Sequence, residues 1–205
     1  EHKKPKKIAT FFSYHMPNIV YVGQNHLVDM PHMGLYHLGG KQDILILLGD
    51  FQPTNEESCF SFCETVLDVV EEFNCKEVLT LGGIGLNEIP EKPKVYVTGN
   101  NKKFVNTFKK DIVDHKLYGV VGPIVGITGL LLGLAQRRKI NGASLLSETL
   151  NHPMYLGLRG AHVIINVLNH HLKLKVPLHQ LDEEIKAVES ELRSAEDMIS
   201  KKYKS

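Results

Sequence analysis

Short aliphatic runs of strand length alternate with helical patterns along most of the chain. Residues 43–50 (DILILLGD) and 76–83 (KEVLTLGG) are near-continuous apolar runs that end in turns, which is typical of strands buried on both faces of a parallel sheet. A shorter run of the same kind occupies 94–99 (KVYVTG). Two more strands are predicted at 118–122 (YGVVG) and 142–149 (GASLLSET).

Apolar residues recur at helical spacing between and after these strands. The predicted helices cover about 55–74, a segment with Phe104, Phe108 and Ile112 on one side, and 155–172. A repeated strand-then-helix order predicts right-handed crossovers. The expected fold is therefore a mostly parallel sheet with helices on both sides.

The segment 116–142 contains no Asp, Glu, Lys, Arg or His between Lys116 and Arg137, which raises the question of a membrane span. A membrane helix needs ~20 apolar residues without a break. Pro123 and its flanking glycines interrupt this run near the middle. The run is predicted to divide into the strand 118–122, a turn and a core helix from about 128 to 138, and no membrane partner is expected.

Glycines within this segment allow a packing role and a ligand role. Gly129 and Gly133 are four residues apart and would leave one helix face bare, so that the backbone can approach a sheet closely. The glycine-rich turns GPIVGITG and LGGIGLNEIPEKP could instead bind an anion on backbone amides. They lack the lysine of a P-loop and the spacing of a dinucleotide fingerprint, so packing and turn roles are favoured.

Composition narrows the class of protein. The 205 residues are 42% hydrophobic and 23% charged, as in a soluble globular protein. Lys and Arg total 24 against 23 for Asp and Glu, so no basic field indicates nucleic acid as a partner. Three cysteines and no export leader favour a reducing cytoplasm. Cys59 and Cys63 lie on the apolar stripe of a helix, and no metal site is predicted from them or from the histidine spacings.

Candidate catalytic groups would lie beyond the carboxyl ends of the strands. This ligand edge is predicted to be lined by Asp50, Gly82 to Gly85, Gly99, Asn100, Gly122 to Thr128, Glu148 and His152. Asp50 and Glu148 could form an acid–base pair, with His152 as a proton carrier. Because no nucleophile motif or metal-spaced set accompanies them, no catalytic residue and no cofactor are predicted. The alternative hypothesis is a hydrolase or transferase for a nucleoside- or phosphate-containing molecule, with a cleft near Gly82, Gly126 and Glu148.

After residue 176 the chain becomes polar and is predicted to form one long helix from about Leu178 to Lys202. An apolar seam with 4-3-4-3-4 spacing runs along it: Leu181, Ile185, Val188, Leu192, Ala195 and Ile199. About three heptads are marginal for a lone coiled coil, so the seam is expected to pack on the domain or on another subunit. The expected domains are a core at 1–176 and a C-terminal helix and tail at 177–205.

Two blocks of sequence carry a family resemblance. One is GVVGPIVGITGLLLGLAQRRKINGASLLSETL, followed by a helix and LDEEIKAVESELR, and the other is DILILLGDFQP leading through a helix to VLTLGGIG. Together they resemble the archaeal branch of the proteasome assembly chaperone family, over roughly residues 8–193. The resemblance implies a three-layer α/β/α sandwich, similar in outline to nucleoside phosphorylases and hydrolases, with a mostly parallel sheet and a long C-terminal helix.

The same resemblance implies a protein-binding function without catalysis. Members associate with themselves as homo-oligomers and help α-type proteasome subunits assemble, and some end in a hydrophobic–Tyr–any tripeptide that docks between those subunits. This chain departs from that pattern, because its tyrosine is third from the end and follows a lysine. From the seam and the tail, partner binding is expected at Leu192, Ile199, Tyr203, Lys204 and Ser205. The opening strand–turn–helix unit of the family is expected to be missing from this sequence.

Overall fold

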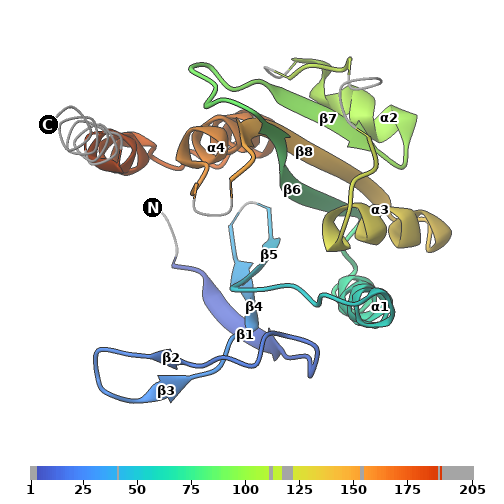
Figure 1. Cartoon of the computed structure of the whole chain (residues 1–205). Coiled ribbons are helices and arrows are strands. Elements are labelled where there is room, and N and C mark those ends of the chain that lie inside the picture. Colours follow the sequence, from blue (N-terminus) through green and yellow to red (C-terminus); the bar gives the residue numbers. More distant parts are fainter. Residues whose placement is uncertain are drawn as a thin grey trace, which may run out of the picture. The chain divides into compact units, whose positions relative to one another are not determined.

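The computed structural model describes residues 4–40, 42–110, 113–116, 122–152, 155–188 and 190. The chain divides into two compact units, whose elements are shown in Figure 1. The first unit consists of Glu1–Cys75 and Ile124–Leu134, and the second of Lys76–Pro123 and Ala135–Ser205.

The first unit contains two antiparallel sheets. β1 (Lys6–Phe11), β4 (Met33–Leu38) and β5 (Ile44–Gly49) form a three-stranded sheet with β4 in the centre. β2 (Tyr21–Val22) and β3 (Val28–Asp29) pair with each other as a separate hairpin. The first forty residues therefore supply four of the described strands.

Helix α1 (Glu56–Glu72) supplies much of the core of the first unit and confirms the helix predicted at 55–74. The Asn55 side chain caps it by accepting a hydrogen bond from the Ser58 N–H at 2.8 Å. The apolar stripe predicted at Cys59, Phe62, Cys63, Val66, Val70 and Phe73 is buried at Phe62, Cys63 and Val66, and Leu67 beside it is also buried. Phe62 meets Phe11 of β1 edge-on, with ring centroids 5.7 Å apart, so the helix packs on the sheet through this stripe.

Helix α3 (Ile127–Arg137) confirms the helix predicted in the glycine-rich segment. Its first N–H, on Ile127, donates to the Gln52 Oε1 at 3.2 Å. The two glycines of the helix have different surroundings. A Cβ on Gly129 would collide with the Ile124 carbonyl oxygen, whereas a Cβ on Gly133 would have nothing within 4 Å. A close approach is therefore required at Gly129 alone, and it is made to the segment just before the helix, not to a sheet as predicted.

The second unit is built on one mixed sheet. β6 (Glu77–Leu86), β8 (Asn141–Leu150) and β7 (Val95–Gly99) lie in that order, with β8 parallel to β6 and antiparallel to β7. The helices of this unit include α2 (Lys102–Val105), the 3-10 turn η1 (Asn106–Lys110) and α4 (Leu158–Leu172), and a further helical segment covers 179–188. Figure 1 shows α2 and α4 beside β7 and β8.

One face of this sheet and its helices share a single apolar core. The cluster joins residues of β7, β8, α2, η1 and α4: Val95, Val97, Phe104, Phe108, Ala143, Leu145, Ile164 and Val167. Phe108 has no exposed surface and stacks on the His171 ring of α4, with centroids 3.8 Å apart. The helices therefore cover the sheet through aromatic and branched side chains that lie far apart in the sequence.

The prediction of a three-layer α/β/α sandwich with a mostly parallel sheet was wrong. Among the described strands only β6 and β8 pair in parallel, and the sheets have three, two and three strands. Strand β5 was expected to be parallel and buried on both faces, but it pairs antiparallel with β4 and exposes Ile46 and Leu48. Five residues separate β4 from β5, and a parallel crossover needs a dozen or more. Most of the strand predicted at 118–122 lies outside the described residues.

The two glycines of α3 provide a matched pair of alanine substitutions. Gly133→Ala should raise the free energy of unfolding by up to ~1 kcal/mol, because alanine favours a helix and its methyl group meets open space. Gly129→Ala should lower it by roughly 1–3 kcal/mol, because the methyl group must displace the backbone of Ile124. Urea unfolding followed by circular dichroism measures both changes, and equal effects at the two sites would contradict the packing described for α3.

The Cys63 thiol should be unreactive in the folded protein. Burial, with smaller contributions from the nearby Cys59 and Glu64, raises its pKa to about 12. Below that pKa the thiol stays protonated, so a disulfide reagent at mildly alkaline pH should label the half-buried Cys59 and Cys75 before Cys63. Peptide mapping after labelling in buffer and in urea separates the three sites. Labelling of Cys63 as fast as Cys59 in buffer would show that α1 is not packed as described.

Candidate functional site

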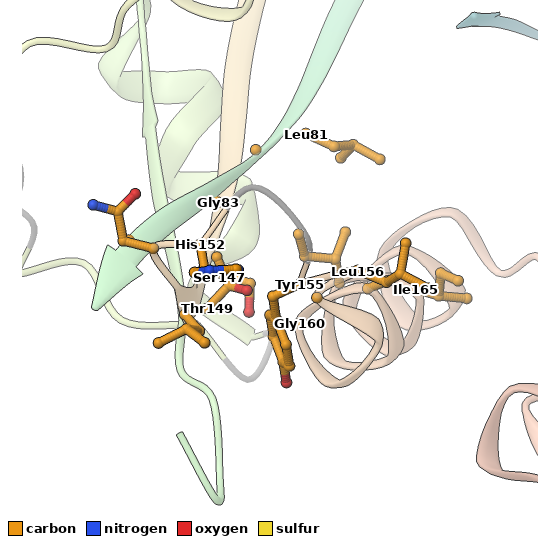
Figure 2. A pocket seen from close by; sticks show the side chains of 16 residues that line it. Leu81, Gly83, Ser147, Thr149, His152, Tyr155, Leu156, Gly160 and Ile165 are labelled. Atoms are coloured by element: carbon orange, nitrogen blue, oxygen red, sulfur yellow. The ribbon is translucent and has the colours of Figure 1, made fainter. Parts of the chain in front are cut away.

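A groove of about 720 Å³ lies in the second unit, where β6 and β8 end beside the start of α4. Because these two strands are parallel, their carboxyl ends meet at the same edge of the sheet, where ligands bind in open α/β folds. Figure 2 shows the side chains of Ser147, Thr149 and Tyr155 gathered next to α4. The ligand edge predicted from the sequence therefore coincides with a groove.

Glycines set the shape of the groove on the side of α4. A Cβ on Gly160 would lie 3.2 Å from the Ser147 Oγ and 3.3 Å from the Glu148 carbonyl oxygen, so the helix approaches β8 closely at this point. Gly157 precedes α4 with a φ of 63°, a left-handed conformation that suits glycine. Larger residues at these two positions would push the helix away from the strand.

The groove offers neutral hydrogen-bonding groups. Its described lining carries hydroxyl groups from Ser147, Thr149 and Tyr155 and the imidazole of His152, but no Asp, Glu, Lys or Arg side chain. Ser147 is almost fully buried, and its hydroxyl donates to the Glu148 carbonyl oxygen at 3.4 Å. Such a lining can hold a polar, uncharged group, and it lacks the paired carboxylates needed for acid–base chemistry.

Glu148 has a structural role, not the catalytic role considered in the alternative hypothesis. Side chains alternate along a strand, so Glu148 projects from the face of β8 opposite to Ser147 and Thr149. Its carboxylate accepts hydrogen bonds from the Tyr96 O–H at 3.0 Å and from the Lys94 N–H at 2.9 Å. Burial raises the pKa of Tyr96, and the hydrogen bond and charge of Glu148 raise it further. Glu148 thus joins the start of β7 to the end of β8.

Asp50 also makes local backbone contacts. It follows β5 in the first unit and accepts a hydrogen bond from the His32 N–H at 3.2 Å, while its own N–H donates to the His32 carbonyl oxygen at 3.2 Å. It therefore closes the end of the β4–β5 pair. Gly126, another member of the predicted cleft, belongs to the same unit and lies against the Gln52 side chain.

The other residues predicted at the ligand edge fall into two groups. Gly82, Gly83, Gly85 and His152 line the groove. Gly99 and Asn100 lie at the opposite end of the sheet, because β7 runs antiparallel and Gly99 pairs with Ala143 near the start of β8. There the Asn100 side chain donates to the Ile140 carbonyl oxygen at 3.0 Å and accepts from the Gly142 N–H at 2.8 Å.

The residues predicted to bind a partner, Leu192, Ile199, Tyr203, Lys204 and Ser205, lie outside the described residues. The segment leading to them is helical at 179–188, and the first three residues of the predicted seam, Leu181, Ile185 and Val188, are half-buried there. The His162 Nε2 of α4 contacts the Asp182 Oδ1 at 3.0 Å. Asn169 exchanges two hydrogen bonds of 2.8 Å with the backbone of Val176. These contacts tie the start of the C-terminal helix to α4.

An apolar surface on the β2–β3 hairpin was missed by the sequence interpretation. Val22 and Val28 are among its exposed hydrophobic residues. The available signal was the lack of any Asp, Glu, Lys or Arg from Ile8 to Val28, in a chain that is 23% charged overall.

The described part of the chain lacks two other classes of site. No group of three or more His, Cys, Asp or Glu side chains in that part of the chain is arranged to hold a metal ion. Among the helices with described coordinates, none combines the length and apolar character needed to cross a membrane.

The bridge between Tyr96 and Glu148 can be tested by mutation. Glu148→Ala should lower the free energy of unfolding by roughly 1.5–3 kcal/mol, because two donors lose a charged acceptor. It should also bring the Tyr96 pKa closer to its ordinary value, since part of the upward shift comes from the carboxylate. Urea unfolding and ultraviolet titration of the tyrosines measure the two effects, with Glu88→Ala at an exposed position as the control. An unchanged titration together with unchanged stability would contradict the bridge.

Comparison with solved structures shows the same fold in archaeal proteins. The structure is similar to Pyrococcus furiosus PbaB, described as an archaeal proteasome activator, with 28% identity and a TM-score of 0.85 over 94% of this chain and 82% of that one. It is also similar to P. furiosus PbaA, described as an archaeal homolog of a proteasome-assembly chaperone. That match has 23% identity and a TM-score of 0.77 over 96% of this chain and 78% of PbaA, which supports likeness of fold alone.

Sequence comparison gives the family. An uncharacterised protein of Methanocaldococcus jannaschii is 28% identical over 153 residues, which are 75% of this chain. The match spans 57% of that curated relative, a little over half of its length. The PAC2 family model matches residues 1–196 of the 205, in agreement with the resemblance seen in the sequence. The chain therefore belongs to the PAC2 family.

Proposed function

We propose that this protein is a cytoplasmic, non-enzymatic assembly chaperone that binds α-type proteasome subunits and aids assembly of the proteasome core particle. The observation that carries the proposal is family membership over nearly the whole chain, together with the likeness to PbaB at 28% identity. The two carboxylates of the competing enzyme hypothesis, Asp50 and Glu148, bind backbone N–H groups of their own units. That arrangement favours a structural role for both.

The partner-binding element in this proposal is the C-terminal helix and tail, residues 177–205. Contacts of Asp182 and Val176 with α4 fix the start of this helix to the second unit, so that the following residues continue from a defined point. The sequence places Leu192 and Ile199 on the apolar seam, and Tyr203, Lys204 and Ser205 follow it. An apolar stripe on an otherwise polar helix can insert into a groove on a partner protein.

A second candidate function is activation of assembled proteasomes. The likeness to PbaB, which is described as an activator, has a higher TM-score and identity than the likeness to PbaA. The two functions use different partners, because a chaperone meets free subunits whereas an activator meets the finished particle. Binding to isolated α subunits favours the first function, and increased peptide hydrolysis by assembled particles favours the second.

The contribution of the C-terminal seam to partner binding can be tested by a double substitution. Leu192→Asp with Ile199→Asp should weaken binding to α subunits at least ~tenfold, because two charges would enter an apolar contact. Lys186→Ala, at an exposed position off the seam, is the matched control and should bind like the parent protein. Calorimetric titration measures affinity, and thermal unfolding verifies that the units remain folded.

Two outcomes of this experiment count against different parts of the proposal. Equal affinity of the double variant and the parent protein would show that the apolar seam of the C-terminal helix does not contribute to binding. No association between the parent protein and α subunits at micromolar concentrations would count against the chaperone function itself. Faster peptide hydrolysis by assembled particles, without binding to free α subunits, would support the activator.

A further inference from the structure

One end of the sheet in the second unit brings together three segments of the chain: the residue before β6, the residues before β8 and the start of α2 after β7. The Asn141 N–H donates to the Lys76 carbonyl oxygen at 3.3 Å, which joins the first two segments. The Asn101 side chain donates to the Asn141 Oδ1 at 2.8 Å, which joins the third. Because β6 and β8 are parallel and β7 is antiparallel to β8, this is the end of the sheet opposite to the groove.

Basic residues are concentrated in these three segments, 76–77, 100–103 and 137–141. The segments contain a single acidic residue, Glu77, and six basic residues that we term the basic end: Lys76, Lys102, Lys103, Arg137, Arg138 and Lys139. All of the six except Arg138 are exposed. The next carboxylates back along the chain, Glu71 and Glu72, belong to the first unit. The near-equal totals of basic and acidic residues in the whole chain therefore conceal a local excess of positive charge.

Helix geometry accounts for only part of this excess. Arg137 lies in the last turn of α3, where the helix dipole favours a cation. Lys139 follows the same helix with a φ of 62°, a left-handed backbone conformation that glycine adopts freely and that is unfavourable for lysine. The backbone at position 139 therefore disfavours the lysine that occupies it.

The end of α1 shows which residue suits the same backbone. Both helices end with one pattern of hydrogen bonds, in which the left-handed residue donates to the carbonyl three residues back and its successor donates to the carbonyl five residues back. In α1 the left-handed residue is Asn74, with a φ of 54°, and asparagine is the common alternative to glycine at this position. In α3 it is Lys139, so the charge at this position has a stability cost that the fold does not require.

The end of α4 adds two more lysines to this surface. His171 in the last turn of α4 stacks on Phe108 of η1, which directly follows α2, so the end of α4 lies beside these helices. Lys173 and Lys175 come just after α4 and are exposed. Both have left-handed backbones, with φ values of 54° and 59°. Lysine thus occupies a second and a third position whose backbone favours glycine.

The surroundings of the basic end favour an acidic protein surface over nucleic acid. Proteins that bind single strands stack the bases on exposed aromatic side chains, but Phe104 of α2 and Phe108 of η1 are buried. Proteins that read a duplex insert a helix or a β-ribbon into its groove, and α2 has only four residues. The ammonium group of lysine is a compact charge on a flexible stem, which can pair with carboxylates in many geometries.

We infer that the basic end binds an acidic segment of a partner protein, whose Asp and Glu side chains pair with Lys102, Lys103 and Lys139. Cations gathered on one surface repel each other, and carboxylates placed among them replace that repulsion by attraction. The inference goes beyond the proposed chaperone function and does not depend on it, because the binding is measured without any proteasome subunit.

A substitution that stabilises the fold while it weakens binding tests the inference in the full chain. Lys139→Gly removes one cation and suits the left-handed backbone, and Lys102→Ala with Lys103→Ala removes two more cations. The matched control is Lys4→Ala with Lys6→Ala, because these exposed lysines belong to another basic cluster, in the first unit. Fluorescence anisotropy measures binding of a labelled oligoglutamate peptide, and of single-stranded and double-stranded oligonucleotides, at low and at physiological salt.

The parent protein should bind oligoglutamate more tightly than either oligonucleotide, and the affinity should fall as salt rises, because exposed charges are screened. Lys139→Gly should weaken binding about two- to fivefold, as expected for one exposed charge pair, and should raise the midpoint of thermal unfolding by roughly 2–4 °C. The variant with all three substitutions at the basic end should bind at least ~tenfold more weakly, whereas the control should bind like the parent. Circular dichroism verifies that every variant is folded.

Three results would overturn the inference. The parent protein could fail to bind oligoglutamate at low salt, or the folded triple variant could bind it as tightly as the parent. The control could also lose as much affinity as the variant of Lys102 and Lys103, which would show that total charge and not its location determines binding. Tighter binding of an oligonucleotide than of oligoglutamate, lost in the triple variant, would assign the basic end to nucleic acid and would equally refute an acidic protein partner.

Discussion

Burial of strand β8 is the constraint on which the second unit depends. Its residues Gly142–Ser147 are all buried, and it is hydrogen-bonded on both sides, to β6 over ten positions and to β7 over five. A buried strand must have its backbone groups paired, so the burial of β8 depends on its hydrogen bonds to β6 and β7. One face of β8 also holds Ala143 and Leu145 against α4, and the position of α4 defines the groove at the end of the strand.

Part of this arrangement could be predicted from the sequence. The run GASLLSET indicates a buried strand because apolar and small residues follow one another without alternation, and β8 is such a strand. The run DILILLGD looks the same, yet β5 lies at the edge of an antiparallel sheet with Leu48 exposed. An aliphatic run predicts a strand, but it carries no information on the direction or number of its neighbours. The short connection from β4 to β5 carried that information, but β4 itself had not been predicted.

The candidate site was predictable to a similar degree. The carboxyl edge of parallel strands was expected to form a ligand edge, and glycines of β6 together with His152 line a groove there. The role of Glu148 was not predictable, because its partner Tyr96 is 52 residues away and the hydrogen bond depends on the antiparallel register of β7 and β8. Strand alternation could have placed Glu148 and Ser147 on opposite faces of β8, but it could not have identified Tyr96 as the partner of Glu148.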